Sequence, residues 1–377
     1  MRGVRDLIRL KTIRLSVSDK GGEYVVIPHQ LDVEITKKHL EDASLYRPSS
    51  EKEFKSKYRK LNHEWAKMAK AAGLKPSVIS QLKVALPTCP VLYLLIKTHK
   101  LVSSDDLAST DPSLFKVRPI ISCVDGPTDR ITWFLTLIFN QLLKHIPAHL
   151  TNTQMFLDRL RTAQPNSACV MESFGVTALY TNVSNDSAVQ AIFKLLTQHE
   201  GEINMYGFRI EQLMALLKEC LSCSIFRWSG KYYTQIRGLA MGQRLAPRLA
   251  TAFMSKVEAP VTDLGPLLYC RFDNRSVTFE EHQAEEHNLW HYLYFIVWLQ
   301  IKDETEFTGP ESYVAQCVKD RNLDWFPRMR AISLQDCDSE SDQSEVTALR
   351  EQLRQQSQSI NELAATVDNL RQVGFLS

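Results

Sequence analysis

The spacing of hydrophobic positions predicts a series of β strands along the first three quarters of the chain. Residues 12–28 carry branched side chains that alternate on both sides of a turn sequence, Asp-Lys-Gly-Gly at 19–22, which is typical of two strands joined by a tight turn. Residues 91–100 and 115–124 are apolar runs of buried-strand character, and the first ends in basic residues. A further strand is expected at 168–176, before a turn and a helix.

Helical patterns alternate with these strands. From residue 30 to about residue 72 the pattern is helical and strongly basic, and Gly73 and Pro76 close it. Residues 131–145 predict a long amphipathic helix, and residues 245–258 predict another.

Two hairpins are also expected. One turns at Ser229-Gly230, and the other covers 264–279 with Asp273-Asn274 at its apex. Helices and strands mixed in this way indicate an α+β fold.

The last quarter of the chain has a different character. Residues 281–335 are rich in aromatic residues and show no pattern that we can assign, and residues 336–345 form an acidic, serine-rich linker. Residues 346–371 follow a heptad register, which predicts a coiled coil and homo-oligomerisation through 346–370, the alternative being a helix folded onto the domain. The core positions of this register are Val346, Leu349, Leu353, Gln356, Ile360, Leu363, Val367 and Leu370.

No segment is expected to cross a membrane. The longest apolar run, at 289–301, is shorter than the ~20 residues that a membrane-spanning helix needs, so a buried helix or strand is expected there. The N-terminus has no pattern of a cleavable signal, which leads us to expect an intracellular protein, in the nucleus or the cytoplasm.

Charge is distributed unevenly, although the net charge is only +2. Residues 1–100 hold 20 Lys and Arg against 10 Asp and Glu, whereas residues 303–377 hold 7 against 14. A basic first third is what a surface that binds a polyanion requires, and a solvated, lysine-rich helix face would give the same composition.

Cysteine and histidine spacing gives weak metal signals. The eight cysteines are single except for Cys220 and Cys223, which lack a second pair at zinc spacing, so buried free thiols are expected. His287 and His291 are one helical turn apart but have no acidic residue between them that would complete a metalloprotease motif.

The order of the elements between about residues 12 and 275 resembles the reverse transcriptases of Penelope-like retroelements, which are relatives of telomerase. Six motifs in the family's order carry the resemblance, and each alone is a weak signal. They are SDKGGEYVVI, YLLIKTHK, VRPIIS, SFGVTALYTNVSNDSAVQAI, GLAMGQRLAPRLATAFM and LLYCRFDN.

The resemblance implies a right-hand polymerase, with fingers in 1–165 and an antiparallel palm sheet with helices in 166–280. The motifs indicate that the thumb is incomplete or absent. The predicted coiled-coil helix is C-terminal to them. The implied reaction is RNA-directed DNA synthesis by two-metal nucleotidyl transfer, with Mg²⁺ as cofactor and an RNA or DNA primer–template as partner. Mg²⁺ prefers hard oxygen ligands, so the palm has to bring aspartates together from neighbouring strands.

Several motif residues match the roles that the resemblance implies. In the fingers, Lys97, Lys100 and Arg118 take the positions of cations that bind the incoming triphosphate, although Ile96 replaces the family's proline. Tyr180 takes the place of the side chain that excludes ribonucleotides. The glycine-bearing motif supplies the remaining positions, with Gln243 on the nucleotide side and Gly238 and Gly242 beside the template and primer.

The palm motifs depart from the family at the metal ligands. The family's first palm motif reads Ser-Phe-Asp-Val, and Gly175 stands here in place of its aspartate. In the third motif one residue is missing and the second aspartate is Asn274, so Asp273 is the sole surviving palm carboxylate and metal ligand. Glu172 and Asp186 are nearby in sequence but are poorly placed to substitute for the missing aspartate.

These departures predict a degenerate catalytic site with impaired polymerase activity. Two alternatives stay open. One is a non-catalytic nucleic-acid-binding or oligomerising protein built on the polymerase scaffold, and the other is an active polymerase whose carboxylates come from elsewhere in the chain.

Overall fold

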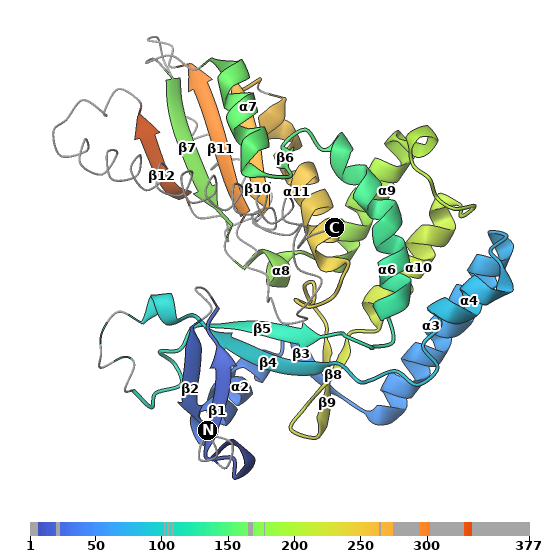
Figure 1. Ribbon diagram of the computed structural model, residues 1–377, viewed down its shortest axis with the longest axis vertical. Helices are drawn as coiled ribbons and strands as arrows, with labels where there is room; N and C mark the ends of the chain where they lie inside the picture. The colour runs from blue at the N-terminus through green and yellow to red at the C-terminus, as the bar shows by residue number, and fades with distance from the viewer. Residues whose placement is uncertain are drawn as a thin grey trace, which may run out of the picture.

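The computed structural model describes two five-stranded sheets, a separate two-stranded hairpin and a group of packed helices (Figure 1). It describes residues 7–19, 23–101, 103, 106, 109–164, 169–176, 178–263, 265–273, 294–301 and 328–333. The predicted acidic linker and coiled coil lie outside these residues. The predicted α+β class is confirmed for the described part of the chain.

The N-terminal hairpin forms as expected. Strands β1 (Ile13–Val17) and β2 (Tyr24–Pro28) pair antiparallel, with Val17 opposite Tyr24 at the turn end. At this end the backbone N–H of Asp19 donates to the carbonyl of Ile96 at 2.9 Å, which joins the hairpin to the next sheet.

The first five-stranded sheet, which we call the β4–β5 sheet, has the order β3-β9-β8-β4-β5. The predicted apolar runs form its antiparallel strands β4 (Val91–Ile96) and β5 (Val117–Ser122). The other strands are β3 (Tyr46–Ser49), β8 (Ile225–Trp228) and β9 (Lys231–Gln235). Positive φ angles at Ser229 and Gly230 form the two-residue turn between β8 and β9 that the sequence predicts.

The second sheet, which we call the β7–β10 sheet, has the order β12-β7-β11-β10-β6. Its strands are β6 (His149–Leu150), β7 (Cys169–Gly175), β10 (Leu268–Asp273), β11 (Tyr294–Ile301) and β12 (Arg328–Ser333). Among the described strands, the antiparallel partner of β10 is β11. The second half of the predicted 264–279 hairpin, residues 274–279, lies outside the described residues.

The two sheets interleave along the sequence. Strand β6 comes from the range predicted as fingers but joins the β7–β10 sheet, and β8 and β9 come from the predicted palm but join the β4–β5 sheet. Residues 281–335, which had no predicted pattern, supply β11 and β12. The predicted boundary between 165 and 166 therefore follows neither sheet.

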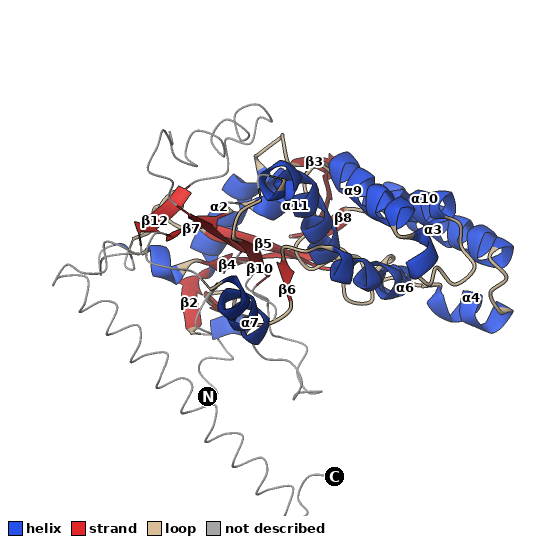
Figure 2. Ribbon diagram, turned by 90° about the horizontal axis from the view of Figure 1, so that it is seen from above, coloured by secondary structure: helices blue, strands red, loops and turns tan. Residues whose placement is uncertain are grey.

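Helices cover one side of this arrangement, and Figure 2 shows α3, α9 and α10 lying side by side. The predicted helical stretch 30–72 is two helices, because strand β3 interrupts it. The helices are α2 (His29–Leu40), α3 (Glu51–Ala71), α4 (Pro76–Leu82), α6 (Asp129–Phe139), α7 (Thr153–Ala163), α8 (Leu179–Asn182), α9 (Asn185–Gln198), α10 (Ile210–Ser222) and α11 (Ala246–Thr262). Short 3₁₀ helices are η1 (Thr98–Lys100), η2 (Asn140–His145) and η3 (Glu200–Glu202).

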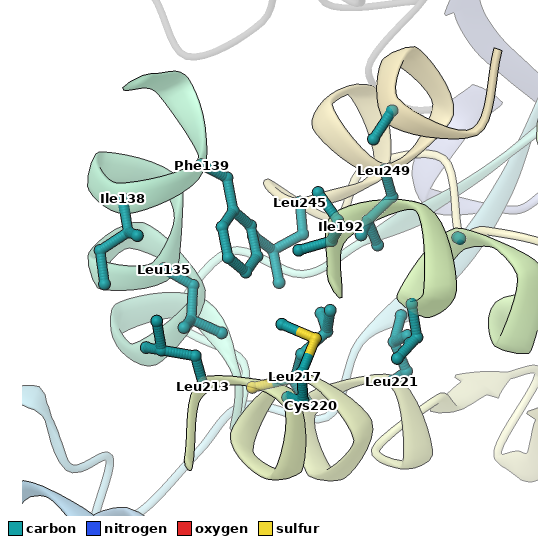
Figure 3. Packing of buried hydrophobic residues seen from close by; sticks show 14 of the residues in the cluster. Leu135, Ile138, Phe139, Ile192, Leu213, Leu217, Cys220, Leu221, Leu245 and Leu249 are labelled. Atoms are coloured by element: carbon teal, nitrogen blue, oxygen red, sulfur yellow. The ribbon is translucent and has the colours of Figure 1, made fainter. Parts of the chain in front are cut away.

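The largest hydrophobic core lies among these helices (Figure 3). Leu135 of α6, Leu217 of α10 and Leu249 of α11 are fully buried and converge on it. Each fully buried aliphatic side chain stabilises the fold by about 1.5–3 kcal/mol. This core fixes the positions of α9, which follows β7 and α8, and of α11, which precedes β10. Strands β7 and β10 carry the candidate site. Among the described residues, no helix is both long and apolar enough to cross a membrane.

Candidate active site

The two strands that carry the predicted metal positions end at the same edge of one sheet. Strands β7 and β10 both pair antiparallel with β11, so they run parallel to each other on its two sides. Gly175 is the last residue of β7, and Asp273 is the last residue of β10. With neighbouring strands about 4.8 Å apart, the two strand ends are about 10 Å apart. The predicted pair of positions thus meets at one edge.

The register offsets the two positions by one residue. Gly175 is opposite Phe295, and Phe295 is opposite Phe272, so positions 175 and 272 share one face of the sheet. Asp273 is opposite Tyr294 and takes the other face. A one-residue difference in a strand moves a position to the opposite face. The offset matches the missing residue in the third palm motif.

The neighbouring carboxylates do not compensate at this edge. Position 172 is three residues before Gly175 on β7, about 10 Å from the strand end, and by the alternation of the strand it lies on the face opposite to position 175. Asp186 lies exposed in the first turn of α9, beyond α8. Both observations agree with the sequence expectation that neither residue replaces the missing aspartate.

The predicted cations of the fingers gather at one end of the β4–β5 sheet. Lys97 follows β4 directly, Lys100 ends η1, and Arg118 is in β5 opposite Leu95. Arg118 is buried, and its Nε lies 2.6 Å from Oδ1 of Asp19, whose side chain is 1% exposed. Lys100 is exposed to solvent.

The sequence predicts Asp19 only as part of a turn. A buried arginine in a strand needs a negative partner, because an unpaired buried charge is costly. The only available signal was that the apolar run of 115–124 contains an arginine, which implies an acid at a strand end nearby. The pair neutralises one of the three predicted triphosphate-binding cations.

Tyr180 is a core residue in this conformation. It lies in α8 with 2% of its surface exposed and belongs to the hydrophobic core of the helices. Its carbonyl accepts a 2.6 Å hydrogen bond from the backbone N–H of Leu239, which holds the glycine motif against α8. The predicted contact with the sugar of a nucleotide stays a prediction, and it requires α8 to expose this side chain.

Gly238 and Gly242 are required by contacts within the protein. Both have positive φ, +83° and +111°. A Cβ at Gly238 would lie 2.6 Å from the carbonyl oxygen of Tyr180, and one at Gly242 would lie 2.3 Å from that of Ile121. The loop 238–242 therefore bridges α8 and β5, while its predicted contact with template or primer stays a prediction. Gln243 follows this loop and is buried.

A buried ionic network lies behind the sheet edge. Arg271 of β10 donates from Nη1 to both carboxylate oxygens of Glu258 at 2.8 Å, and from Nη2 to the carbonyl of Thr251 at 3.2 Å. The side chains of Arg271 and Glu258 are 0% and 3% exposed. Burial raises the pKa of Glu258 to about 7, although Arg271 and a hydrogen bond from Tyr269 oppose that rise.

His149 of β6 belongs to the same region, because it is paired with Arg271 across the parallel strands. Burial, together with the charges of Arg271 and Arg159, lowers the pKa of His149 to about 4. This network was not predicted. Arg271 is part of the third palm motif, and an arginine inside an apolar strand was the only indication of a buried acid.

The Cys220 and Cys223 pair does not form a metal site with other described residues in the structure. Both thiols are free and buried, in the helical core. Burial raises the pKa of both thiols, to about 12 for Cys223. Buried thiols of this kind act as small hydrophobic groups. His287 and His291 lie outside the described residues.

The residues at the sheet edge do not fit a two-metal centre. Such a centre needs carboxylates that share both ions. Gly175 offers no ligand atom, and Asp273 is at a position on the opposite face of the sheet. The residues at this edge therefore do not supply the ligand set of a two-metal reaction.

Comparison with known proteins gives two separate similarities. No protein-family model matches the chain. An 85-residue part is 76% identical to the inositol 1,4,5-trisphosphate receptor itr-1 of Caenorhabditis elegans, which is 22% of this chain but 3% of that receptor. The match thus spans a very small part of the receptor's length and shows nothing of its activity.

The solved structures that resemble the fold are telomerases. The apo telomerase of Candida tropicalis truncated from its C-terminal domain aligns with a TM-score of 0.50 at 10% identity, over 87% of this chain and 60% of that one. Telomerase of Candida albicans in complex with a fragment of telomeric RNA aligns over 87% of this chain and 51% of that one, at 10% identity and a TM-score of 0.48. The chain spans about half to three fifths of these telomerases. In fold, the chain is similar to telomerase, which is related to the reverse transcriptases.

Proposed function

We propose that this chain is a reverse-transcriptase-like protein of Penelope-like retroelement origin whose palm no longer supports efficient nucleotidyl transfer. The observation that carries the proposal is the sheet edge itself. The strands β7 and β10 still bring positions 175 and 273 to one edge, and the first position is a glycine. Six family motifs in order, on a telomerase-like fold, support the same scaffold.

The loss of activity follows from the chemistry of the site. A telomerase-like polymerase fold implies the use of divalent metal ions in general, and Mg²⁺ is the ion expected for the family. Without the bridging aspartate, the ions lose both affinity and orientation. Removing that ligand is expected to cost several kcal/mol of transition-state stabilisation, since metal ions contribute about that much to charge stabilisation.

Primer extension tests this proposal. The full chain is incubated with an RNA template, a DNA primer, nucleotides and Mg²⁺ or Mn²⁺, and extension is measured on gels. We expect no extension above background, and robust template-dependent extension would contradict the proposal. If extension appeared and Asp273→Asn abolished it, the site would be an active one completed by other carboxylates.

Restoring the missing carboxylate sharpens the test. Gly175→Asp alone is expected to leave the chain inactive, because position 273 lies on the other face of the sheet. The control Gly201→Asp places the same charge at an exposed glycine with no atoms near its Cβ direction. Extension restored by Gly175→Asp, and not by the control, would show that Asp273 needs only one partner.

The second candidate function is nucleic-acid binding without synthesis, and helix α3 favours it. Its buried residues Phe54, Leu61 and Trp65 form one face, and the rest of its surface is rich in lysine and arginine. The telomerase of Candida albicans was solved with telomeric RNA, and we propose an RNA or DNA partner for this chain by analogy. Contacts between such a face and phosphates weaken as salt rises.

A charge-reversal variant tests that candidate. Lys52, Arg59 and Lys67 are exposed on α3, and their combined change to glutamate is expected to lower the affinity for primer–template at least about tenfold at low salt. Filter binding over a salt series measures this. The matched control changes Lys194, Lys218 and Lys256, on other helices, to glutamate. Equal losses in both variants would show that the binding is not located at α3.

The predicted oligomer is tested separately. Deletion of 346–377 is expected to lower the oligomeric state in light scattering if the heptad segment self-associates. An unchanged state would remove the coiled-coil prediction and leave the polymerase-scaffold proposal intact.

A further inference from the structure

Three metal-ligating side chains meet at one end of the helical core, away from the sheet edge. His145 ends η2, His199 follows the last residue of α9, and Glu202 ends η3. One ligand atom from each residue lies within 4.8 Å of the other two. Helix α9 is 14 residues long, which separates its two ends by about 20 Å. This cluster is therefore distinct from the candidate active site.

The carboxylate of Glu202 faces both imidazoles. His199 Nδ1 is 3.0 Å from one carboxylate oxygen, and His145 Nε2 is 3.9 Å from the other. The two rings stack with centroids 3.9 Å apart and an angle of 21° between their planes. The donor set is thus two histidine nitrogens and one carboxylate.

The two segments are held together independently of these three residues. The amide oxygen of Gln141 in η2 accepts a 2.9 Å hydrogen bond from the backbone N–H of Asn204, and its Nε2 donates to the carbonyl of Asn204 at 3.1 Å. Ile146 and Ile203, next to the ligands in each segment, are buried in the core. The packing therefore presets the distance between His145 and Glu202.

His145 gives a second, independent indication of a ligand. Its Nε2 is buried and has no hydrogen-bond partner among the described residues. Its side chain is only 11% exposed. A buried polar atom without a partner is costly, so native structures rarely retain one without a reason. A cation between the two rings and the carboxylate would satisfy this nitrogen.

We propose that His145, His199 and Glu202 bind a zinc ion. Zinc takes histidine nitrogens at about 2.0–2.1 Å and carboxylate oxygens at about 2.0–2.2 Å, and it prefers a tetrahedral arrangement. Ligand atoms around such an ion are about 3.3 Å apart, a value that lies between the two observed nitrogen–oxygen distances of 3.0 and 3.9 Å. A zinc ion lies in the plane of each imidazole that binds it, so the two rings turn out of their stacked arrangement when they share the ion. The exposed side of Glu202 leaves the fourth position to water.

The zinc site has a structural role in this proposal. It links η2, which follows α6, to the turn after α9, and both helices contribute to the main core. The expected result is one zinc ion per chain and a more stable helical region.

Metal binding to the full chain tests the proposal. The protein is stripped with a chelator and dialysed, and Zn²⁺ binding is followed by isothermal titration calorimetry, with Co²⁺ absorption as a probe of tetrahedral coordination. His145→Gln and His199→Gln are each expected to weaken Zn²⁺ binding at least about tenfold and to abolish the tetrahedral Co²⁺ spectrum. Unaltered binding in both variants would overturn the proposal, as would the absence of binding by the parent chain.

Matched variants keep the test decisive. Glu202→Gln changes an exposed ligand and leaves the packing in place, so it tests the site even if the histidine variants fold poorly. Glu200→Gln, in the same turn but outside the cluster, is expected to bind Zn²⁺ like the parent chain. Thermal unfolding should show a rise in Tm with Zn²⁺ that Glu202→Gln loses and Glu200→Gln retains. An equal rise in both variants would place the bound zinc elsewhere in the chain.

Discussion

In a polymerase, two regions would act in the same reaction: the cation end of the β4–β5 sheet and the carboxylate edge of the β7–β10 sheet. In this chain the two regions are preserved differently. At the first, Arg118 is buried and paired with Asp19. At the second, the position expected for an aspartate is Gly175, although the buried pair of Arg271 and Glu258 lies intact behind it.

The difference follows from what each group contributes to stability. Carboxylates clustered at a metal site repel one another in the absence of the ions, so replacing one of them costs the fold nothing. A buried ion pair is different, because removing one partner leaves an uncompensated charge in the interior. Catalytic residues can therefore be lost while the ionic and hydrophobic interior of the same strands remains.

The buried palm pair gives the largest expected effect. Glu258→Gln leaves Arg271 charged and without its carboxylate, and we expect a loss of about 3–5 kcal/mol in the free energy of unfolding. Urea denaturation measures this loss. The control Glu53→Gln removes the carboxylate of the exposed Arg47 pair and should cost no more than about 1 kcal/mol. Similar losses in the two variants would refute the contrast between buried and exposed pairs.

The glycine motif comes next in size. Gly238→Ala puts a Cβ within 2.6 Å of the carbonyl oxygen of Tyr180 at a φ of +83°. Backbone strain of about 1–2 kcal/mol and overpacking of about 1–3 kcal/mol both oppose it. Gly73→Ala has a similar φ, +79°, and no atom within 4 Å of the added Cβ, so it isolates the strain. If the two variants were equally destabilised, the close approach of the loop to α8 would carry no cost.

The finger pair is expected to have a smaller effect on stability and a separate effect on binding. Asp19→Asn removes the charge next to Arg118 and is expected to cost about 1.5–3 kcal/mol, the range for a hydrogen bond to a charged group. If Arg118 binds a triphosphate, the same change strengthens nucleotide binding, because the cation is no longer neutralised.

Calorimetry with a nucleoside triphosphate distinguishes these two effects. Asp158→Asn, which breaks the exposed pair with Arg161, should alter neither stability nor binding. Weaker triphosphate binding by Asp19→Asn would show that Asp19 positions Arg118 instead of masking it.

The sequence predicted local elements better than their partners. The β1–β2 pairing, the β8–β9 turn, the strands β4 and β5 and the helix predicted at 245–258 depend on residues close together in the chain, and the structure has them. The pairing of β10 with β11 could not be predicted, because 20 residues separate the two strands and apolar patterning alone does not choose a partner. Strand β3, which lies within the basic stretch, could not be predicted for the same reason, because Tyr46 joins a sheet only through the pairing of β3 with β9.

The candidate site shows the same limit. Gly175 and Asp273 were identified from motif positions, and the structure brings them to one edge. Their one-residue offset depends on the register of β11 between them, which no motif records. The buried partners Asp19, Glu258 and His149 belong to other elements than the arginines they accompany, so tertiary packing alone identifies them.

The smallest expected effect is the pH dependence that His149 confers. Its pKa is lowered to about 4 by burial and by Arg271 and Arg159, against 6.5 for the ordinary group. The unfolded chain therefore binds a proton below pH 6.5 that the folded chain does not, and stability falls as the pH drops from 6.5 towards 4. Between pH 6.5 and 5 this amounts to about 2 kcal/mol, at 1.36 kcal/mol per pH unit.

Urea denaturation of the parent chain and of His149→Gln at pH 7 and pH 5 measures this contribution. Between pH 7 and pH 5, the free energy of unfolding of the parent chain should fall by about 2 kcal/mol relative to that of His149→Gln. A pH-independent difference between the two proteins would mean that the region behind the sheet edge is hydrated, and the contrast between a preserved dry interior and a lost catalytic edge would no longer hold.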